Sequence, residues 1–218
     1  INDKDSKTAT IYENWSIDTL NTKLDDEPEQ YVKCTLHVEE AKAFATVIGT
    51  LPSQFHQTLE NVGHEIEITG QLNRGHAFNG DVVVVQLLDH LVNGRLQGQV
   101  KGILKRALDP NNRLFVCTAD PENTGILTPI NPDMPRLYCL TSAARIKLAR
   151  KGNVCVYKFV SSSCIEFSHY EHIDPADNAS RLFIVRYLTW EPEFLLPLGV
   201  VVGMLNLDDS LDKEMQVL

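Results

Sequence analysis

The sequence predicts a mainly β protein built from two small closed barrels in tandem, the second larger than the first. Apolar and polar side chains alternate over several short stretches, which is typical of strands with one face in water. Residues 82–85 are four consecutive valines, which is typical of a strand covered on both faces. Asn79-Gly80 precedes them and tolerates the positive φ of a sharp turn. These observations favour short strands joined by tight corners.

The first barrel is expected over residues 31–96. Strands are predicted by alternation or by an apolar run at residues 31–38, 44–48, 64–69 and 82–88. A short helix is predicted within residues 52–62, with Ser53 as its N-cap. Several strands with little helix in about 60 residues are typical of a five-stranded Greek-key barrel of the OB type. Residues 89–96 are interpreted as a short polar joint to the next domain.

The second barrel is expected over residues 97–205, decorated by one helix and an insertion. Its strands are predicted at residues 97–104, 113–118, 126–130, 137–140, 154–160, 182–188 and 199–205. Residues 141–152 predict the helix, because Thr141 or Ser142 can cap it, cations occupy its last turn and Gly152 can end it. Residues 161–180 are polar and are interpreted as the insertion.

Both ends of the chain are acidic. Residues 1–30 are interpreted as an extension and linker that either straps onto a barrel through Trp15 or stays mobile. Residues 206–218 are interpreted as an acidic linker toward a further, catalytic domain. We expect the sequence to be a piece of a longer protein.

The net charge of −9 is unevenly distributed. Residues 1–96 hold 7 Lys and Arg against 15 Asp and Glu, whereas residues 97–205 hold 12 against 10. The second barrel is therefore mildly basic, and a local basic stripe can attract a polyanion although the whole chain is acidic. The same asymmetry is equally explained by solvated surface charge.

The sequence lacks the residue patterns of several other functional classes. No apolar run approaches the length of a membrane span, and no phosphate-binding glycine loop occurs. The five cysteines are odd in number and form no CxxC pair, which favours reduced thiols in the cytoplasm or nucleus, mostly as core residues. Cys164, His169 and His172 have spacings that zinc could use, but a fourth ligand is missing, so no metal site and no catalytic residue is assigned.

Several motifs resemble one family. Residues 98–106 (GQVKGILKR), 127–131 (LTPIN), 134–140 (MPRLYCL) and 186–205 (RYLTWEPEFLLPLGVVVGML) look like the second cold-shock-type barrel of the RNB exoribonucleases, which are RNase II-like. Residues 70–85 (GQLNRGHAFNGDVVVV) resemble the end of that family's first cold-shock barrel. The motifs occur in the family's order over about residues 31–205. Residues 186–202 are most similar to the RNB region of a multidomain helicase.

The resemblance implies a function in RNA metabolism. It implies that the barrels bind single-stranded RNA and guide it to a downstream RNB domain, which hydrolyses RNA from the 3' end with magnesium. The chain itself ends before the family's aspartate cluster, so we expect it to have no nuclease activity and no cofactor of its own. The Lys-Gly-Phe and Val-Phe-Val-His stacking motifs of bacterial cold-shock proteins are absent.

Basic grooves and aromatic rings hold single strands on such barrels. The candidate RNA-binding residues, including some carried by the predicted helix, are Arg74, His76, Lys101, Lys105, Arg106, Arg113, Phe115, Arg136, Tyr138, Arg145 and Lys147. Phe78, Phe115 and Trp190 fit a core position better than a stacking role, whereas Tyr138 fits either. We expect charge reversal of both Lys105 and Arg106 to weaken RNA binding and leave the barrel folded.

Three functions remain open. The chain is an RNA-guiding module, a protein-interaction or regulatory module whose acidic first barrel meets a protein partner, or a structural spacer beside a degenerate nuclease. Salt-sensitive binding of single-stranded RNA separates the first function from the other two.

Overall fold

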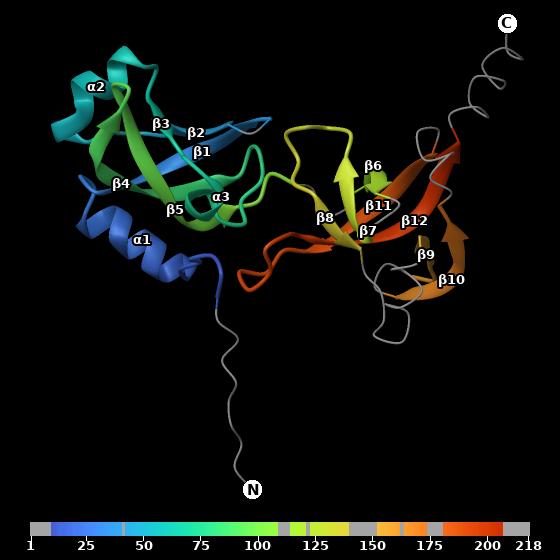
Figure 1. Ribbon diagram of the computed structural model, residues 1–218. Coiled ribbons are helices and arrows are strands. Elements are labelled where there is room, and N and C mark those ends of the chain that lie inside the picture. Colours follow the sequence, from blue (N-terminus) through green and yellow to red (C-terminus); the bar gives the residue numbers. More distant parts are fainter. Residues whose placement is uncertain are drawn as a thin grey trace, which may run out of the picture. The chain divides into compact units, whose positions relative to one another are not determined.

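A computed structural model describes residues 10–40, 42–108, 114–120, 123–139, 152–161, 164–173 and 181–206. The chain splits into two compact units (Figure 1). The first contains Ile1–Asp109 and Glu191–Leu195, and the second contains Pro110–Trp190 and Leu196–Leu218. Within the described ranges, no helix is long and apolar enough to cross a membrane.

The first unit is a closed five-stranded barrel, as predicted. Its strands are β1 (Tyr31–Glu39), β2 (Lys42–Val47), β3 (Glu65–Glu67), β4 (Val82–Val92) and β5 (Arg95–Lys105), paired in the order β1-β2-β3-β5-β4. All neighbours are antiparallel except β3 and β5. The alternation seen in the sequence sends Leu36, Ile66 and Val85 into a core from which water is excluded.

The hairpin between β4 and β5 corrects the predicted domain boundary. Residues 89–96 are not a joint, because both strands continue to a tight turn at Asn93 and Gly94, with φ of 50° and 78°. Positive φ at both positions matches the twist of the flanking strands. Strand β5, expected to open the second barrel, therefore closes the first, and the division falls at Asp109/Pro110 and not after Leu96.

An unpredicted helix covers one side of this barrel. Helix α1 (Ile17–Asp26) begins at Ser16, whose hydroxyl accepts a hydrogen bond from the backbone N–H of Thr19 at 3.2 Å. Its Leu20 is fully buried and lies over Gly102 of β5. Burial of this face stabilises a helix that its acidic composition alone does not favour. The strap through Trp15 is observed, since its backbone N–H donates to the Lys101 carbonyl at 2.9 Å.

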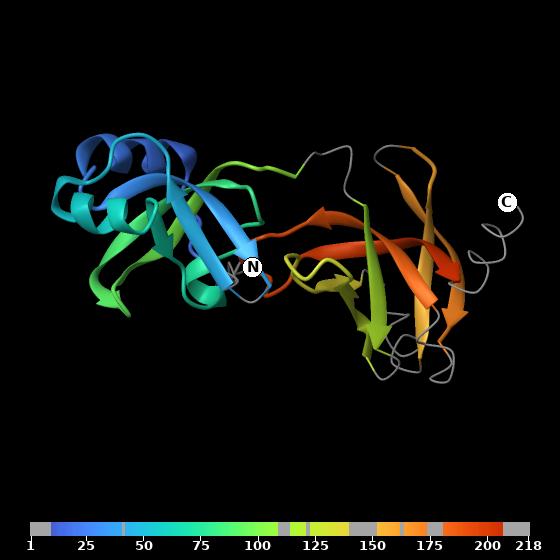
Figure 2. The same ribbon diagram turned by 90° about the horizontal axis from the view of Figure 1, so that it is seen from above.

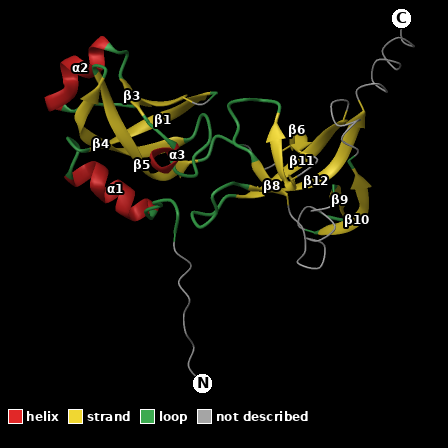
Figure 3. Ribbon diagram, viewed as in Figure 1, coloured by secondary structure: helices red, strands yellow, loops and turns green. Residues whose placement is uncertain are grey.

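The short helices of the first unit lie in the segments that connect one strand to the next (Figure 3). The helix expected within residues 52–62 is present, as a 3₁₀ turn (Ser53–Phe55) followed by α2 (His56–Asn61). Ser53 lies inside the 3₁₀ turn and is not its cap. The loop between β3 and β4, residues 68–81, is called the elbow. It contains one further turn of helix, α3 (Gln71–Arg74), which the sequence did not predict.

The second unit repeats the strand pairing of the first. Its strands are β6 (Leu114–Asp120), β7 (Asn123–Pro129), β8 (Leu137–Cys139), β9 (Asn153–Phe159), β10 (Ile165–His172), β11 (Arg181–Thr189) and β12 (Leu198–Asn206). They form one sheet in the order β10-β9-β12-β11-β6-β7-β8, and a parallel pairing of β12 with β8 closes β6, β7, β8, β12 and β11 into a ring. This is the second OB-type barrel that the sequence predicted.

The hairpin of β9 and β10 is an addition to this ring, beside β12 (Figure 2). Strand β10 lies in residues 161–180, the polar insertion, for which the sequence predicted no strand. Its polar side chains are tolerated because β10 is the last strand of the sheet and most of its residues are exposed or half-buried. The predicted helix over residues 141–152 lies almost wholly outside the described residues.

The cysteines are reduced. Cys34, Cys117, Cys139 and Cys155 are buried, and Cys164 is exposed. Burial raises the pKa of Cys117 and of Cys139 to about 12, so these thiols stay protonated and act as small core side chains.

Candidate nucleic-acid interface

Arg106 does not point a free guanidinium into solvent. Its Nη1 donates to Oδ2 of Asp81 and to the backbone carbonyl of His76, both at 2.8 Å. Asp81 is fully buried, and its other acceptor contacts are the backbone N–H groups of Phe78 at 2.9 Å and Ala107 at 2.8 Å. Arg106 thus neutralises a buried carboxylate at the elbow, which corrects its assignment to RNA.

The expectation for the Lys105 and Arg106 double charge reversal changes accordingly. Glutamate at position 106 would face buried Asp81, so it would destabilise the barrel. Lys105, in contrast, is exposed at the end of β5 and remains a candidate for phosphate contact. It belongs to the first barrel and not, as expected, to the second.

His76 is buried and is therefore a poor phosphate ligand. Only 5% of its surface is exposed, and its ring stacks on Tyr12, with 6.4 Å between the centroids. Burial, and then the nearby Arg106 charge, lower its pKa to about 4. The imidazole is neutral at physiological pH and part of the packed elbow.

Lys101 is covered by the segment that precedes α1. It is 6% exposed, and its ammonium forms an ion pair with Glu13 and donates to Oε1 of Gln99 at 2.8 Å. The same ammonium lies 5.5 Å from the ring centroid of Trp15. These contacts already balance its charge, so Lys101 is corrected from an RNA contact to a structural residue.

Arg74 keeps one donor unused. The residue is half-buried in α3, and its Nη2 donates to the Gln71 side chain. Its Nε is buried and has no hydrogen-bond partner, and burial lowers its pKa. A cavity of about 50 Å³ beside it is lined also by Ala43, Ile68 and Gly70. The cavity has room for an ordered water. Arg74 remains a candidate for contact with a phosphate only where it reaches the rim of this cavity.

The candidate residues of the second barrel fall into two groups, those that face outward and those that face the core. Tyr138 in β8 is half-buried and lies between buried Leu137 and Cys139, so its side chain faces outward. Arg136 is exposed two residues earlier, on the same side of the chain as Tyr138. An aromatic ring on β8 and a guanidinium directly before this strand thus lie on the same side of the chain, which is the combination that binds single strands.

The remaining aromatic candidates are core residues. Phe115 in β6 is half-buried and shares the inner face of the strand with buried Cys117 and Ala119, which corrects its stacking role. Phe78 and Trp190 are each 3% exposed, as expected. Three predicted contacts, Arg113, Arg145 and Lys147, lie outside the described residues.

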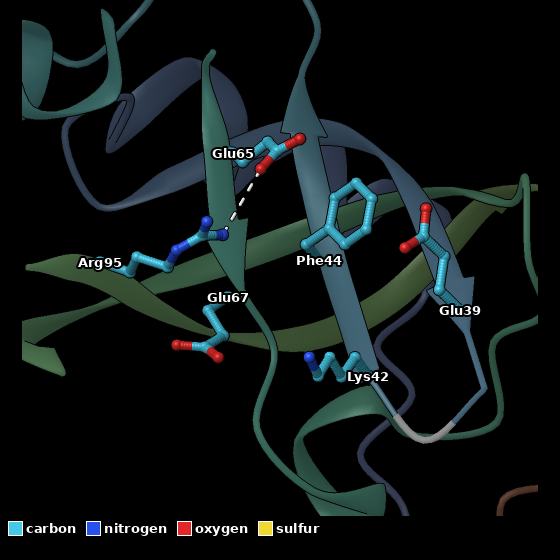
Figure 4. Close-up of a pocket in the computed structure, with 6 residues that line it drawn as sticks. All are labelled: Glu39, Lys42, Phe44, Glu65, Glu67 and Arg95. Atoms are coloured by element: carbon cyan, nitrogen blue, oxygen red, sulfur yellow. Dashed lines mark ion pairs between the residues drawn. The ribbon is translucent and has the colours of Figure 1, made fainter. Parts of the chain in front are cut away.

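A groove on the first barrel was missed from the sequence (Figure 4). Its volume is about 490 Å³, and it lies on the outer face of the sheet. The residues that line it, drawn from β1, β2, β3 and β5, are Glu39, Lys42, Phe44, Glu65, Glu67 and Arg95. The alternation of Glu65 and Glu67 with buried Ile66 predicted an outward face but not the neighbours that complete it.

The groove combines charges of both signs with one aromatic ring. Arg95 lies 3.6 Å from the Glu65 carboxylate, and Glu67 accepts a hydrogen bond from the Gln97 amide at 2.8 Å. Three carboxylates against two cations make it net acidic. Phosphate is repelled from such a surface, which separates it from the face of β8.

A family model matches most of the first unit. Residues 13–109 match the model described as "3'-5' exoribonuclease HELZ2, OB-fold domain". This region is similar to the HELZ2 OB-fold family. The resemblance found in the sequence is confirmed: the multidomain helicase to which residues 186–202 are similar is HELZ2, the helicase with zinc finger domain 2, and the relatives reported next carry that name.

Two full-length HELZ2 proteins are similar to most of the chain. The 3'-5' exoribonuclease HELZ2 of Mus musculus is 31% identical over 203 residues, which cover 90% of this chain and 6% of the relative. That of Homo sapiens is 30% identical over 213 residues, which cover 96% of this chain and 7% of the relative. The chain thus spans a small part of the length of either relative.

One solved structure supports the tandem fold. Yeast Ssd1, described as a pseudonuclease, has a TM-score of 0.56 and 16% identity, and the match covers 91% of this chain and 25% of Ssd1. At this identity the likeness concerns the fold alone. It extends beyond the HELZ2 OB-fold match at residues 13–109 into the second unit.

Proposed function

We propose that this chain is a single-stranded RNA-binding module, and that the outer face of β8 carries the main contact. The observation behind this proposal is the pair formed by Tyr138, which faces outward on β8, and Arg136, which is exposed directly before this strand. A phenol ring stacks on any nucleobase, and a neighbouring guanidinium neutralises the adjacent phosphate. Binding through such a pair depends little on base sequence.

The first barrel contributes less to this function. Two of its predicted cations, Lys101 and Arg106, are already paired with carboxylates, and its groove is net acidic. Exposed Lys105 is its best remaining phosphate contact. The proposal therefore assigns RNA affinity mainly to the second barrel, as its mildly basic composition suggests.

We further propose that the module guides RNA toward a catalytic domain. Both relatives are named 3'-5' exoribonucleases, and each is far longer than this chain. We assign the hydrolysis, and the magnesium that it requires, to the parts of such a protein that this chain does not span. The role of the barrels is then to hold and orient the strand.

Fluorescence anisotropy with a labelled oligouridylate of about 12 nucleotides tests the proposal. We expect Tyr138→Ala to weaken binding at least about fivefold, since stacking contributes about 1–3 kcal/mol per base. Arg136→Glu should weaken binding similarly at low salt. Lys33→Glu makes the same change in charge at an exposed position on β1 and should have little effect.

Two results contradict the proposal. Absence of salt-sensitive RNA binding by the wild-type chain would support the spacer or protein-interaction functions instead. Equal affinity of wild type and Tyr138→Ala, with RNA bound by both, would place the contact on another surface.

A further inference from the structure

We infer that the groove on the first barrel is a docking site for an extended, arginine-containing segment of a protein partner. This function is additional to the RNA binding proposed for the second barrel. It uses residues that the RNA contact does not need, and its charge is opposite to the one that RNA requires.

Phe44 and Glu67, which line the groove, belong to an ordered row of side chains across four strands. The strand registers place His37 of β1 opposite Phe44 of β2, Phe44 opposite Glu67 of β3, and Glu67 opposite Gln97 of β5. The rings of His37 and Phe44 are stacked, with centroids 5.1 Å apart and planes at 18°. A flat aromatic surface therefore lies directly beside a carboxylate.

The Glu67 carboxylate is oriented but keeps its charge. The Gln97 amide donates to it at 2.8 Å, and the Thr69 hydroxyl donates to Gln97 Oε1 at 2.7 Å. Gln97 is 3% exposed, so the packing around its side chain holds this chain of hydrogen bonds in place. Because both donors are neutral, Glu67 still presents a full negative charge to the groove.

The cations of the groove leave an acidic excess. Arg95 lies beside Glu65 at 3.6 Å, and Lys42 is the register partner of Glu39 at the β1–β2 turn (Figure 4). The stacked rings and Glu67 therefore form the part of the groove that a further cation complements. Figure 4 shows Phe44 in the middle of the groove, with carboxylates around it.

Arginine fits this arrangement better than other cations. A guanidinium is planar, stacks on aromatic faces and makes two parallel hydrogen bonds with a carboxylate, whereas the lysine ammonium is a compact, strongly hydrated charge. The groove runs over several strands and has a volume of about 490 Å³, so it accommodates the neighbouring residues of an extended chain as well.

The test uses the whole 218-residue chain and a fluorescein-labelled octapeptide of alternating arginine and glycine, followed by anisotropy. We expect salt-sensitive binding that is about three- to tenfold tighter than binding of the matching lysine–glycine peptide. Glu67→Gln, which keeps the shape of the side chain, and Phe44→Leu, which removes the ring and keeps an apolar side chain, should each lower the affinity about fivefold.

Glu60→Gln is the matched control, because it makes the same charge change at an exposed carboxylate on α2, outside the groove. It should leave peptide affinity unchanged, as should Arg136→Glu. Equal affinity for the arginine and lysine peptides, or full affinity in both groove variants, would overturn the inference. Loss of oligouridylate binding in Glu67→Gln would assign the groove to RNA instead, whereas failure of the RNA proposal alone would leave peptide binding intact.

Discussion

At the scale of single residues, the buried carboxylate of Asp81 fixes the conformation of the elbow of the first barrel. Its carboxylate has no exposed surface and accepts hydrogen bonds from two backbone N–H groups and from Arg106. A carboxylate is stable at this depth only because these donors replace water. The residues that looked like an RNA-binding elbow in the sequence are therefore the supports of a buried charge.

Asp81→Ala should destabilise the chain by about 3–5 kcal/mol, because it removes the acceptor of the Arg106 guanidinium and of the backbone N–H groups of Phe78 and Ala107. Urea denaturation followed by circular dichroism measures the change. Asp89→Ala, at an exposed position on β4, should change stability by less than about 0.5 kcal/mol. Similar losses in both variants would contradict the structural role of Asp81.

His76 makes stability depend on pH. Its pKa is lowered to about 4 in the folded chain from 6.5, so the unfolded chain binds more protons between these values. Stability contributed by the neutral imidazole is present above pH 6.5 and is lost as pH falls toward 4, by about 3 kcal/mol in total.

Denaturation at a series of pH values measures this loss. His76→Phe keeps a ring next to Tyr12 and cannot titrate, so it should reduce the pH dependence across this window. His56→Gln, at a half-exposed position on α2, is the control and should retain the wild-type dependence. An unchanged profile in His76→Phe would show that other groups cause the acid sensitivity.

At the scale of elements, strand β5 holds the first barrel together from both faces. On its inner face, a Cβ built at Gly98 would lie 2.5 Å from Val85 Cγ1 and 2.7 Å from Ile66 Cγ2. On its outer face, a Cβ at Gly102 would lie 2.8 Å from Leu20 Cδ1 of α1. Glycine is required at both positions by close approach of neighbouring side chains.

Gly98→Ala should cost about 1–3 kcal/mol, since Val85 and Ile66 are β-branched and cannot turn their methyl groups away easily. Thermal melting measures the loss. Gly125→Ala in β7 is the comparison, because its Cβ would meet Asn123 Oδ1 at 3.4 Å, an ordinary contact. A Gly98→Ala chain as stable as Gly125→Ala would show that the barrel core repacks without cost.

At the scale of the whole molecule, the two barrels share one pattern of strand pairing but present different chemistry. The first carries an acidic groove, and the second carries Tyr138 on β8 and Arg136 directly before it. An acidic chain can therefore bind a polyanion on one unit and a basic partner on the other. The net charge of −9 describes neither surface.

The salt dependence of RNA binding should show how few phosphates are contacted. Each phosphate neutralised on a single strand changes the slope of log K against log salt by about −0.7. We expect Arg136→Glu to reduce the magnitude of the slope by about that amount, and Lys33→Glu to leave it unchanged. Anisotropy titrations between about 50 and 200 mM salt measure both slopes. An unaltered slope in Arg136→Glu would remove this residue from the phosphate contacts.

Much of the fold could be predicted from local pattern. Alternation and apolar runs located every described strand except β10 to within a few residues, although β5 was assigned to the wrong barrel. Asn93-Gly94 carried the strongest short signal for a hairpin and was overlooked, because polar Asp89 and His90 looked like a joint. Helix α1 and strand β10 were missed because packing against neighbouring elements, and not composition, stabilises them.

The tandem barrels and the resemblance to the RNB exoribonucleases follow from periodicity and from motifs of adjacent residues. The same patterns name Arg136 and Tyr138 as candidates but do not place the Tyr138 ring on the surface. Which cations are available for RNA depends instead on contacts between residues far apart in the chain. Lys101 meets Glu13, and Arg106 meets Asp81, across 88 and 25 residues of chain. The groove likewise needs four strands in register. Charges and faces that meet through long-range pairing leave no local pattern in the sequence, so their roles appear only when the barrel closes.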